Sequence, residues 1–369
     1  MKSRRVFALL TAAVFVFAGA AFAQEEAKPV VDVSGVLYLD WGYVQKANEN
    51  SSLQEGSDTM RLQRAYINFA KKIDDVWSVK VTLDGSGVSE SKWDTTTTKN
   101  ETTANNIMFI KNAYVQMKQN FDPVELVVQY GVIGTPIIGH GDGMSGARWI
   151  YNTYLDKSAD LLGDAVDVSS ADLGLKADIS IMKMVTLTGM YANGSNFKFT
   201  EDQQVTDKAY WGVLSINPIK ELLINGYYHT RDIAPGSDDN KVSYYGGGIG
   251  WSDKSFKVGG NFILGERDGA TDANKKDYTL FEVFANINLA DVAGLPVLIY
   301  GKYAYGKSKA DDDAKVDGTQ IWGGLGYQFN KSVQIMALYQ TGEKETTTAA
   351  GVKTKVEEDI VWVKSEVKF

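Results

Sequence analysis

The sequence predicts an all-β fold: a 16-stranded antiparallel transmembrane β-barrel with an in-folded constriction loop. Three observations lead to this prediction. Segments in which apolar and polar residues alternate recur along the chain, and the gaps between these segments are alternately short and long. The chain also starts with an export signal and ends with an alternating strand whose last residue is Phe369.

The N-terminus has the three parts of a cleaved signal peptide. Lys2, Arg4 and Arg5 form a positive region, residues 6–22 are apolar, and cleavage after Ala23 fits the small-x-small rule. A membrane anchor is the alternative, but the apolar stretch is short and polar residues follow it directly. We therefore expect residues 1–23 to be removed during export.

The composition limits the class of protein. With 44% hydrophobic and 23% charged residues the chain resembles a soluble protein, but alternation hides the apolar content of a membrane barrel from hydropathy averages. The absence of cysteine excludes disulfides, thiolate metal sites and cysteine nucleophiles. Loss of the three basic signal residues takes the net charge from −8 to −11, so nucleic acid is not an expected partner. No linker is visible, and residues 24–369 are expected to form a single barrel.

Strands and gaps follow a regular rhythm. The predicted strands are 31–46, 60–71, 77–84, 107–118, 125–134, 168–181, 185–194, 208–216, 222–231, 242–252, 255–267, 278–290, 297–307, 319–329, 332–342 and 358–369. Short gaps at 72–76, 119–124, 182–184, 217–221, 253–254, 291–296 and 330–331 alternate with longer, polar gaps at 47–59, 85–106, 135–167, 195–207, 232–241, 268–277, 308–318 and 343–357. An outer-membrane barrel has short turns on one rim and long loops on the other, and an even strand number places both termini on the short-turn rim. A sandwich or a propeller does not predict this asymmetry.

The two faces of the predicted strands differ in polarity. In 278–290, Phe281 and Val283 share one face, whereas Glu282 and Asn286 share the other. No helical pattern is present that could cover so many apolar faces, so these faces should contact lipid and the polar faces should enclose a wet lumen. Sixteen strands are enough to leave an aqueous channel.

One long gap, 135–167, is the candidate constriction. It is the longest gap and is rich in apolar residues, which an external loop does not need. Its second half has helical spacing, so that Ile150, Tyr154 and Leu161 are expected to pack inward on the barrel wall. A solvent-exposed loop or a contact between subunits is the alternative.

Charged residues of this segment and of the strands are the candidate site residues. The constriction candidates are Asp142, Arg148, Asp156, Asp160 and Asp164, and the lumen-wall candidates are Arg64, Lys80, Asp84, Lys118, Lys176 and Lys302. We hypothesise that the loop carboxylates face Arg64 and Lys80 across the narrowest point, where fixed opposite charges orient dipolar solutes and set ion preference. The alternative for any single residue is that it only keeps the lumen wet.

Two basic residues do not fit the alternation. Arg61 shares its parity with Ala65, Ile67 and Phe69, which directs it toward lipid, and Lys111 has the same problem. Both could extend to the interface and pair with lipopolysaccharide phosphates, or a local β-bulge could redirect them.

Short sequence stretches add a family resemblance. Residues 61–69, 171–175 and 191–195, together with the final Phe369, resemble a trimeric Gram-negative porin, and the nearest pattern is the phosphate-selective porin O and P family. The resemblance implies passive diffusion of small hydrophilic solutes, a homotrimer, a third external loop folded inward, and recognition of Phe369 by the outer-membrane assembly machinery. It also implies an outer-membrane location in contact with lipid and lipopolysaccharide.

Members of that family resemble one another in a ladder of arginines along the lumen, and the resemblance implies phosphate selectivity only where such a ladder is present. The mature chain has only Arg61, Arg64, Arg148, Arg231 and Arg267. Because arginine is better suited than lysine to planar recognition of phosphate, we expect a general pore with a mild cation preference.

Other sites are weaker hypotheses. Gly141–Gly146 matches G-x-G-x-x-G, but a dinucleotide site needs a βαβ unit, which is missing here. His140 and His229 form no recognisable catalytic set, and the loop acids at 268–272 and 311–313 lack the ligand order of a calcium loop. We therefore expect no enzyme activity, no cofactor and no metal site. The alternative functions are an anion- or phosphate-specific channel and, in another class, a surface adhesin or scaffold with a plugged lumen.

Overall fold

The computed structural model describes residues 31–94, 99–151, 153, 161–162, 168–194, 208–232, 241–269 and 275–369, with side chains throughout except at 86–107 and 291. The predicted signal peptide, residues 1–23, lies outside the described residues.

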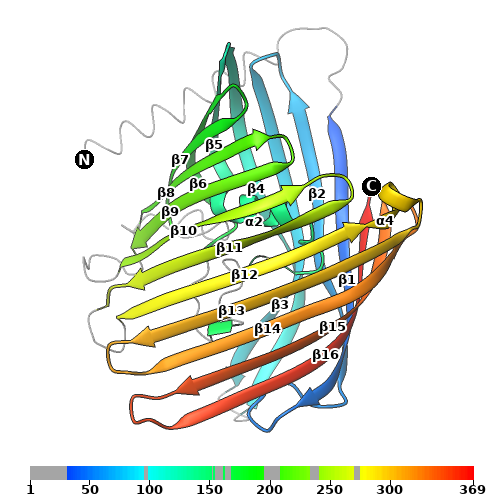
Figure 1. Ribbon diagram of the computed structural model, residues 1–369, viewed down its shortest axis with the longest axis vertical. Helices are drawn as coiled ribbons and strands as arrows, with labels where there is room; N and C mark the ends of the chain where they lie inside the picture. Colours follow the sequence, from blue (N-terminus) through cyan, green and yellow to red (C-terminus); the bar gives the residue numbers. More distant parts are fainter. Residues whose placement is uncertain are drawn as a thin grey trace.

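Sixteen antiparallel strands form one closed barrel, in which each strand pairs with its neighbours in sequence and β1 pairs with β16 (Figure 1). The strands are β1 Asp32–Ala47, β2 Asp58–Lys72, β3 Trp77–Asp94, β4 Lys99–Phe121, β5 Val124–Gly134, β6 Ala171–Ile181, β7 Val185–Ala192, β8 Ala209–Ile219, β9 Leu222–Asp232, β10 Lys241–Ser252, β11 Phe256–Arg267, β12 Lys276–Asn288, β13 Val297–Ala310, β14 Lys315–Gln328, β15 Val333–Thr347 and β16 Lys353–Lys368. Closure leaves no edge strand, so the backbone hydrogen bonds are satisfied within the sheet, as lipid requires. The predicted fold class is confirmed.

The hairpins on the long-loop rim extend further than predicted. Residues 85–106 were expected to be a loop, but β3 and β4 continue to Asp94 and from Lys99. Likewise, 343–357 is largely strand, because β15 and β16 stay paired up to Thr347 and Lys353. Ion pairs on this hairpin explain why polar residues form strands here: Lys355 lies 2.9 Å from Glu343, and Lys353 lies 2.8 Å from Glu345.

The other rim carries the short turns, the start of β1 and the C-terminus. Gly35 and Phe369 exchange backbone hydrogen bonds of 2.8 and 3.0 Å, so the first and last strands meet on this rim, as the even strand number predicted. One turn differs from the prediction: β12 ends at Asn288, and a short helix, α4 (Leu289–Ala293), fills the connection to β13. The Asn288 side chain accepts a hydrogen bond from the Ala290 backbone N–H at 3.0 Å and so caps this helix.

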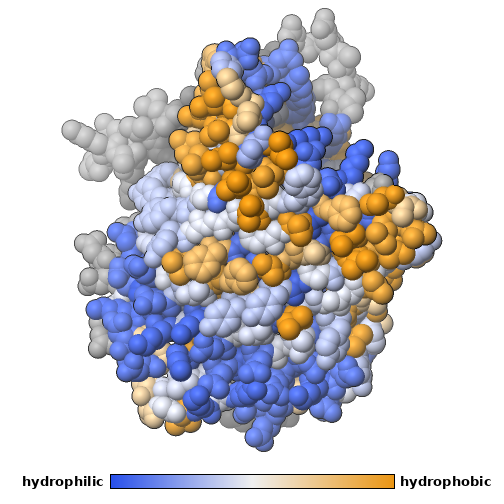
Figure 2. All heavy atoms as spheres, viewed as in Figure 1, coloured by the Kyte–Doolittle hydropathy of each residue, from blue (hydrophilic) through white to orange (hydrophobic). Residues whose placement is uncertain are grey.

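The strand faces alternate as predicted. On β8, Tyr210 and Leu214 are exposed on the outer face, while Trp211 and Ser215 are buried on the inner face. Figure 2 shows apolar surface over the region of β6–β8 and around α4, whereas the end of the barrel that carries the β13–β16 hairpins is hydrophilic. The outer face therefore has the apolar character that lipid contact requires.

The inner face is less polar than predicted. Inward residues such as Tyr244, Tyr278, Trp322 and Leu338 are apolar or aromatic and are fully buried. They belong to two apolar clusters that also contain residues of the segment between β5 and β6. Alternation alone predicted a wet inner face, and it missed these residues because their partners come from a distant loop.

Candidate functional site: the lumen and its inward segment

The segment between β5 and β6 enters the barrel. It begins with helix α2 (Pro136–Ser145), which packs against the inner faces of β8, β10, β11 and β12. The two ends of the segment are held together at the wall, where the Thr135 hydroxyl donates to the Ser169 carbonyl at 2.5 Å. In-folding of the described part of 135–167 agrees with the prediction. Helix α2 is an additional helix in the first half of the segment. Helical structure was predicted for the second half, most of which lies outside the described residues, although residues 161–162 are helical.

The glycine-rich stretch 141–146 is the end of α2. Gly146 follows the helix with φ 58°, and its N–H bonds to the Asp142 carbonyl at 2.9 Å. This left-handed conformation is common where a helix ends. The stretch therefore terminates a helix and does not open one, as a dinucleotide-binding fingerprint would.

Apolar residues fix the inward segment to the wall. Ile137, Ile138, Ile150, Leu161 and Leu162 are each at most 3% exposed. Burial of each such side chain contributes about 1.5–3 kcal/mol, which opposes the entropy cost of ordering a long loop. The predicted inward packing of Ile150 and Leu161 is confirmed, whereas the predicted third contact, Tyr154, lies outside the described residues.

A buried carboxylate adds a polar anchor. Glu282 on β12 accepts hydrogen bonds from Thr153 of the inward segment and from Asn261 of β11, each at 2.8 Å. Its second oxygen lies 2.8 Å from the ammonium of Lys302 on β13. Lys302 points inward as predicted, but it is buried by other residues and does not face the aqueous lumen. Its role is to pair with Glu282 in this anchor.

A β-bulge in β2 places two arginines on the same inner face. Tyr38 pairs with Arg64 and Leu39 pairs with Leu62, so Gln63 is an extra residue that reverses the alternation. Arg61 therefore points into the lumen, where it lies 3.0 Å from Asp40. The interpretation in which Arg61 faces lipid or lipopolysaccharide is wrong, and the bulge alternative is confirmed.

A second bulge has the same effect in β4. Thr82 pairs with Asn112 and Leu83 pairs with Ile110, which leaves Lys111 as the extra residue. The Lys111 ammonium lies 3.5 Å from Asp84 and 3.3 Å from the Tyr66 hydroxyl. Lys111 is therefore a buried inward residue and not a lipid-facing one.

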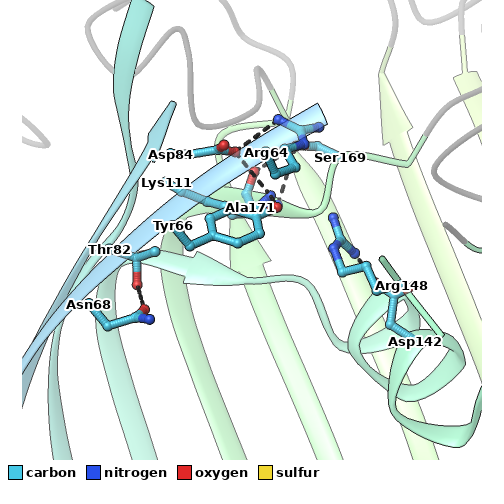
Figure 3. Close-up of polar contacts among 10 residues, drawn as sticks. All are labelled: Arg64, Tyr66, Asn68, Thr82, Asp84, Lys111, Asp142, Arg148, Ser169 and Ala171. Carbon is cyan, nitrogen blue, oxygen red and sulfur yellow. Dashed lines mark hydrogen bonds and ion pairs between the residues drawn. The ribbon is translucent and has the colours of Figure 1, made fainter. Parts of the chain in front are cut away.

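The two bulges create a cationic section of the wall formed by β1–β4 and β16. Asp84 is shared between Arg64, at 2.9 Å, and Lys111 (Figure 3). Asp40 is shared in the same way between Arg61 and Lys364, with the Lys364 ammonium at 3.1 Å. Four cationic groups thus surround two carboxylates. We call these six residues the arginine wall.

Exposure decides what a solute meets at the arginine wall. The side chains of Asp40 and Asp84 are 0% exposed, whereas those of Arg61 and Arg64 are 48% and 23% exposed. The guanidinium groups therefore cover the carboxylates and face the lumen. Guanidinium groups bind carboxylate and phosphate oxygens in a planar, two-point geometry.

The constriction candidates are placed only in part. Asp142 and Arg148 form an ion pair with each other on the inward segment, beside the group around Asp84 (Figure 3). Asp156, Asp160 and Asp164 lie outside the described residues. The hypothesis that loop carboxylates face Arg64 and Lys80 stays a prediction, and among the described groups Arg64 pairs with Asp84 of its own wall.

The remaining wall candidates do not form one cluster. Lys80 is half-buried on β3. Lys118 pairs with Glu125 at 2.7 Å near the short-turn rim, and Lys176 lies 3.9 Å from Asp178 on β6. Only Arg64 and Asp84 of the predicted wall set belong to the arginine wall.

Comparisons with known proteins agree with this architecture. A closed barrel whose lumen holds a charged wall and an inward segment defines a channel-type outer-membrane barrel. The sequence profile of the Gram-negative porin family matches residues 9–355, and the chain belongs to this family. It is an outer-membrane channel.

No curated protein sequence matches the chain. No helix among the described residues is long and apolar enough to span a membrane.

Solved porins have a similar fold at low sequence identity. OmpT of Vibrio cholerae is 15% identical with a TM-score of 0.62, and the match covers 94% of this chain and 99% of that one. OmpF of Salmonella typhi is 12% identical with a TM-score of 0.60, covering 92% and 98%. An anion-selective porin from Comamonas acidovorans is 12% identical with a TM-score of 0.59, covering 93% and 100%.

Proposed function

We propose that this porin is a water-filled channel for passive diffusion of ions and small hydrophilic solutes, and that the arginine wall gives it a mild charge preference. The observation that carries the proposal is the arrangement of exposed Arg61 and Arg64 over buried Asp40 and Asp84. A permeating ion meets positive charge first, because the carboxylates lie behind the guanidinium groups. This wall favours anions.

The inward segment supplies the opposing charge in this proposal. Asp156, Asp160 and Asp164 belong to the part of the segment for which the sequence predicts a position across from the wall. Opposite charges across a narrow lumen produce a transverse field, in which dipolar solutes align and ions of each sign follow different sides. The balance between the two sides sets the net preference, which the sequence alone predicted to be for cations.

An anion-specific channel is the second candidate function. The specific observation in its favour is the bulge at Gln63, which brings Arg61 and Arg64 to one face although alternation would separate them. Two guanidinium groups on one face suit a phosphate or carboxylate. The sequence resemblance to the phosphate-selective porin O and P family also supports this candidate.

The test is the reversal potential of the purified protein in planar bilayers with a KCl gradient. Replacement of both Asp156 and Asp160 by asparagine is expected to shift the reversal potential toward anions, because it removes charge that opposes the arginine wall. An unchanged potential would discard the transverse field. A near-zero conductance would instead favour an adhesin or scaffold with a plugged lumen.

The same proposal includes assembly and export. We propose cleavage after Ala23, recognition of Phe369 by the assembly machinery, contact with lipid and lipopolysaccharide, and no catalytic activity. We also propose a homotrimer. It is supported by exposed apolar residues on β1, among them Val33 and Leu39, and by a solved structure described as the trimer form of OmpT of Vibrio cholerae, 14% identical to this chain.

A further inference from the structure

A cavity of about 570 Å³ lies between the start of α2 and the inner faces of β5–β9. It is distinct from the arginine wall, which β1–β4 and β16 form. Its volume is within the range of about 300–1,000 Å³ that is typical of small-molecule sites. The cavity is therefore large enough for a small solute that enters the lumen.

The lining of this cavity is rich in hydroxyl groups. Ser180, Thr186, Thr188 and Ser215 contribute hydroxyls from three successive strands. Ser180 and Thr186 bond to each other at 2.8 Å across β6 and β7. Neutral groups that both donate and accept are suited to solutes that also carry hydroxyls.

The charges in the lining are already balanced. Lys176 lies 3.9 Å from Asp178, which also accepts a hydrogen bond from Thr188 at 2.6 Å. Glu125 is paired with Lys118 at 2.7 Å. The cavity therefore presents no excess charge that would select an ion, in contrast to the arginine wall.

His140 of α2 adds a neutral group to the lining. Burial lowers the pKa of His140 below its ordinary value of 6.5, although Asp178 opposes and Lys176 assists this shift. The imidazole is consequently uncharged at neutral pH and offers one donor and one acceptor.

One polar side chain of the lining has unused hydrogen-bonding capacity. Ser215 on β8 lines the cavity and is 3% exposed. Within the described part of the chain, its hydroxyl has no hydrogen-bond partner. Buried polar groups without partners are costly in a folded protein, so a bound molecule that gives the Ser215 hydroxyl a partner would be stabilised.

We propose that this cavity is a binding subsite for a neutral polyhydroxylated solute of the sugar or polyol class, held by Ser215 and the neighbouring hydroxyls of Ser180, Thr186 and Thr188. The inference rests on the proposed function, since the solute must reach the lumen. It assigns uncharged solutes to the β5–β9 wall and anions to the arginine wall, so that one lumen carries two routes of different chemistry.

The experiment measures the decrease of KCl current through reconstituted channels as sucrose is added. A polyethylene glycol of similar size serves as the reference, because it has no hydroxyls along its chain. We expect saturable block by sucrose and only a linear, viscosity-like decrease with the polymer. Ser215→Ala should raise the half-blocking sucrose concentration about fivefold, the equivalent of one net hydrogen bond.

Ser308→Ala is the matched control. Ser308 is a buried serine on β13, away from the cavity, and its replacement should leave sucrose block unchanged. Each variant must show the KCl conductance of the natural chain, which establishes that the barrel has folded. If the variants do not conduct, the comparison of sucrose block with polymer block on the natural chain tests the subsite.

The outcomes separate this inference from the proposed function. A linear sucrose response in a channel that conducts KCl would overturn the subsite and leave the channel intact. Equal block by the polymer, or equal sensitivity of the folded Ser215→Ala and Ser308→Ala variants to sucrose, would overturn it as well. A folded protein without KCl current would overturn both.

Discussion

Replacing Arg61 and Arg64 by glutamine tests whether the arginine wall sets ion preference. The substitution removes two exposed positive charges and leaves each buried carboxylate with one partner: Asp40 keeps Lys364 at 3.1 Å, and Asp84 keeps Lys111 at 3.5 Å. Because neither carboxylate is left without a cation, the variant avoids the large cost of an unpaired buried charge.

The size of the effect follows from Coulomb's law. An ion that passes at about 6 Å from one guanidinium in water gains or loses about 0.7 kcal/mol. Screening with a Debye length of about 10 Å reduces this to about 0.4 kcal/mol. Removal of an arginine raises the energy of a passing anion by the amount by which it lowers that of a cation. Each arginine therefore changes the chloride-to-potassium permeability ratio about fourfold, and the pair changes it about fifteenfold.

The assay is the reversal potential in a KCl gradient, measured before and after the double substitution. Lys355→Gln is the matched control, since Lys355 is an exposed cation on the β15–β16 hairpin, paired with Glu343 and Glu357 outside the lumen. The double variant should move toward cation preference by about fifteenfold while the control stays unchanged. If both behave alike, net charge and not the arginine wall determines selectivity, and the reasoning is refuted.

Two further predictions concern the inward segment. A Cβ at Gly318 on β14 would lie 2.2 Å from the Leu161 carbonyl oxygen, whereas a Cβ at Gly323 on the same strand would meet nothing within 4 Å. Gly318→Ala should therefore displace the inward segment and raise the single-channel conductance. Gly323→Ala is the control and should leave the conductance unchanged. Burial lowers the pKa of His140 in the folded protein below its ordinary value of 6.5. As the pH falls below 6.5, His140 is therefore protonated in the unfolded chain before it is protonated in the folded one. This stabilises the unfolded chain, so the free energy of unfolding decreases on acidification. The melting temperature of the natural chain should then fall more between pH 7.5 and pH 5 than that of His140→Asn, and equal decreases would contradict the assignment.

Period-two alternation predicted the barrel and most side-chain directions. Glu282 was placed inward and Phe281 outward, and the structure has Glu282 buried at the lumen and Phe281 exposed on the outer face. This worked because one face of each strand must suit lipid, which imposes a regular pattern over the whole chain. The apolar content of 135–167 indicated in-folding, because an external loop does not need apolar residues.

The bulges could not be placed from one strand alone. The disturbed parity of Arg61 and Lys111 was visible in the sequence, but an extra residue is defined by the pairing with the neighbouring strand. Gln63 has no sequence feature that distinguishes it from an ordinary strand residue. The arginine wall, which depends on both bulges, was therefore beyond sequence reasoning.

Loop lengths and the inner apolar residues were missed for a different reason. Charged hairpins such as β15–β16 have the composition of loops, yet cross-strand ion pairs keep them paired above the apolar band. Trp322 and Tyr244 have the inward direction of lumen residues, and only the inward segment explains why they are apolar. Both outcomes depend on contacts between residues that are distant in sequence.

The most direct test is the single-channel conductance of the purified, folded protein as a function of KCl concentration. A lumen that contains continuous water gives discrete current steps whose size rises in proportion to salt. Folded protein that yields no steps would contradict this account and show that the barrel is sealed. Steps that stop growing at low salt would show a channel with an ion-binding site in place of a continuous water path.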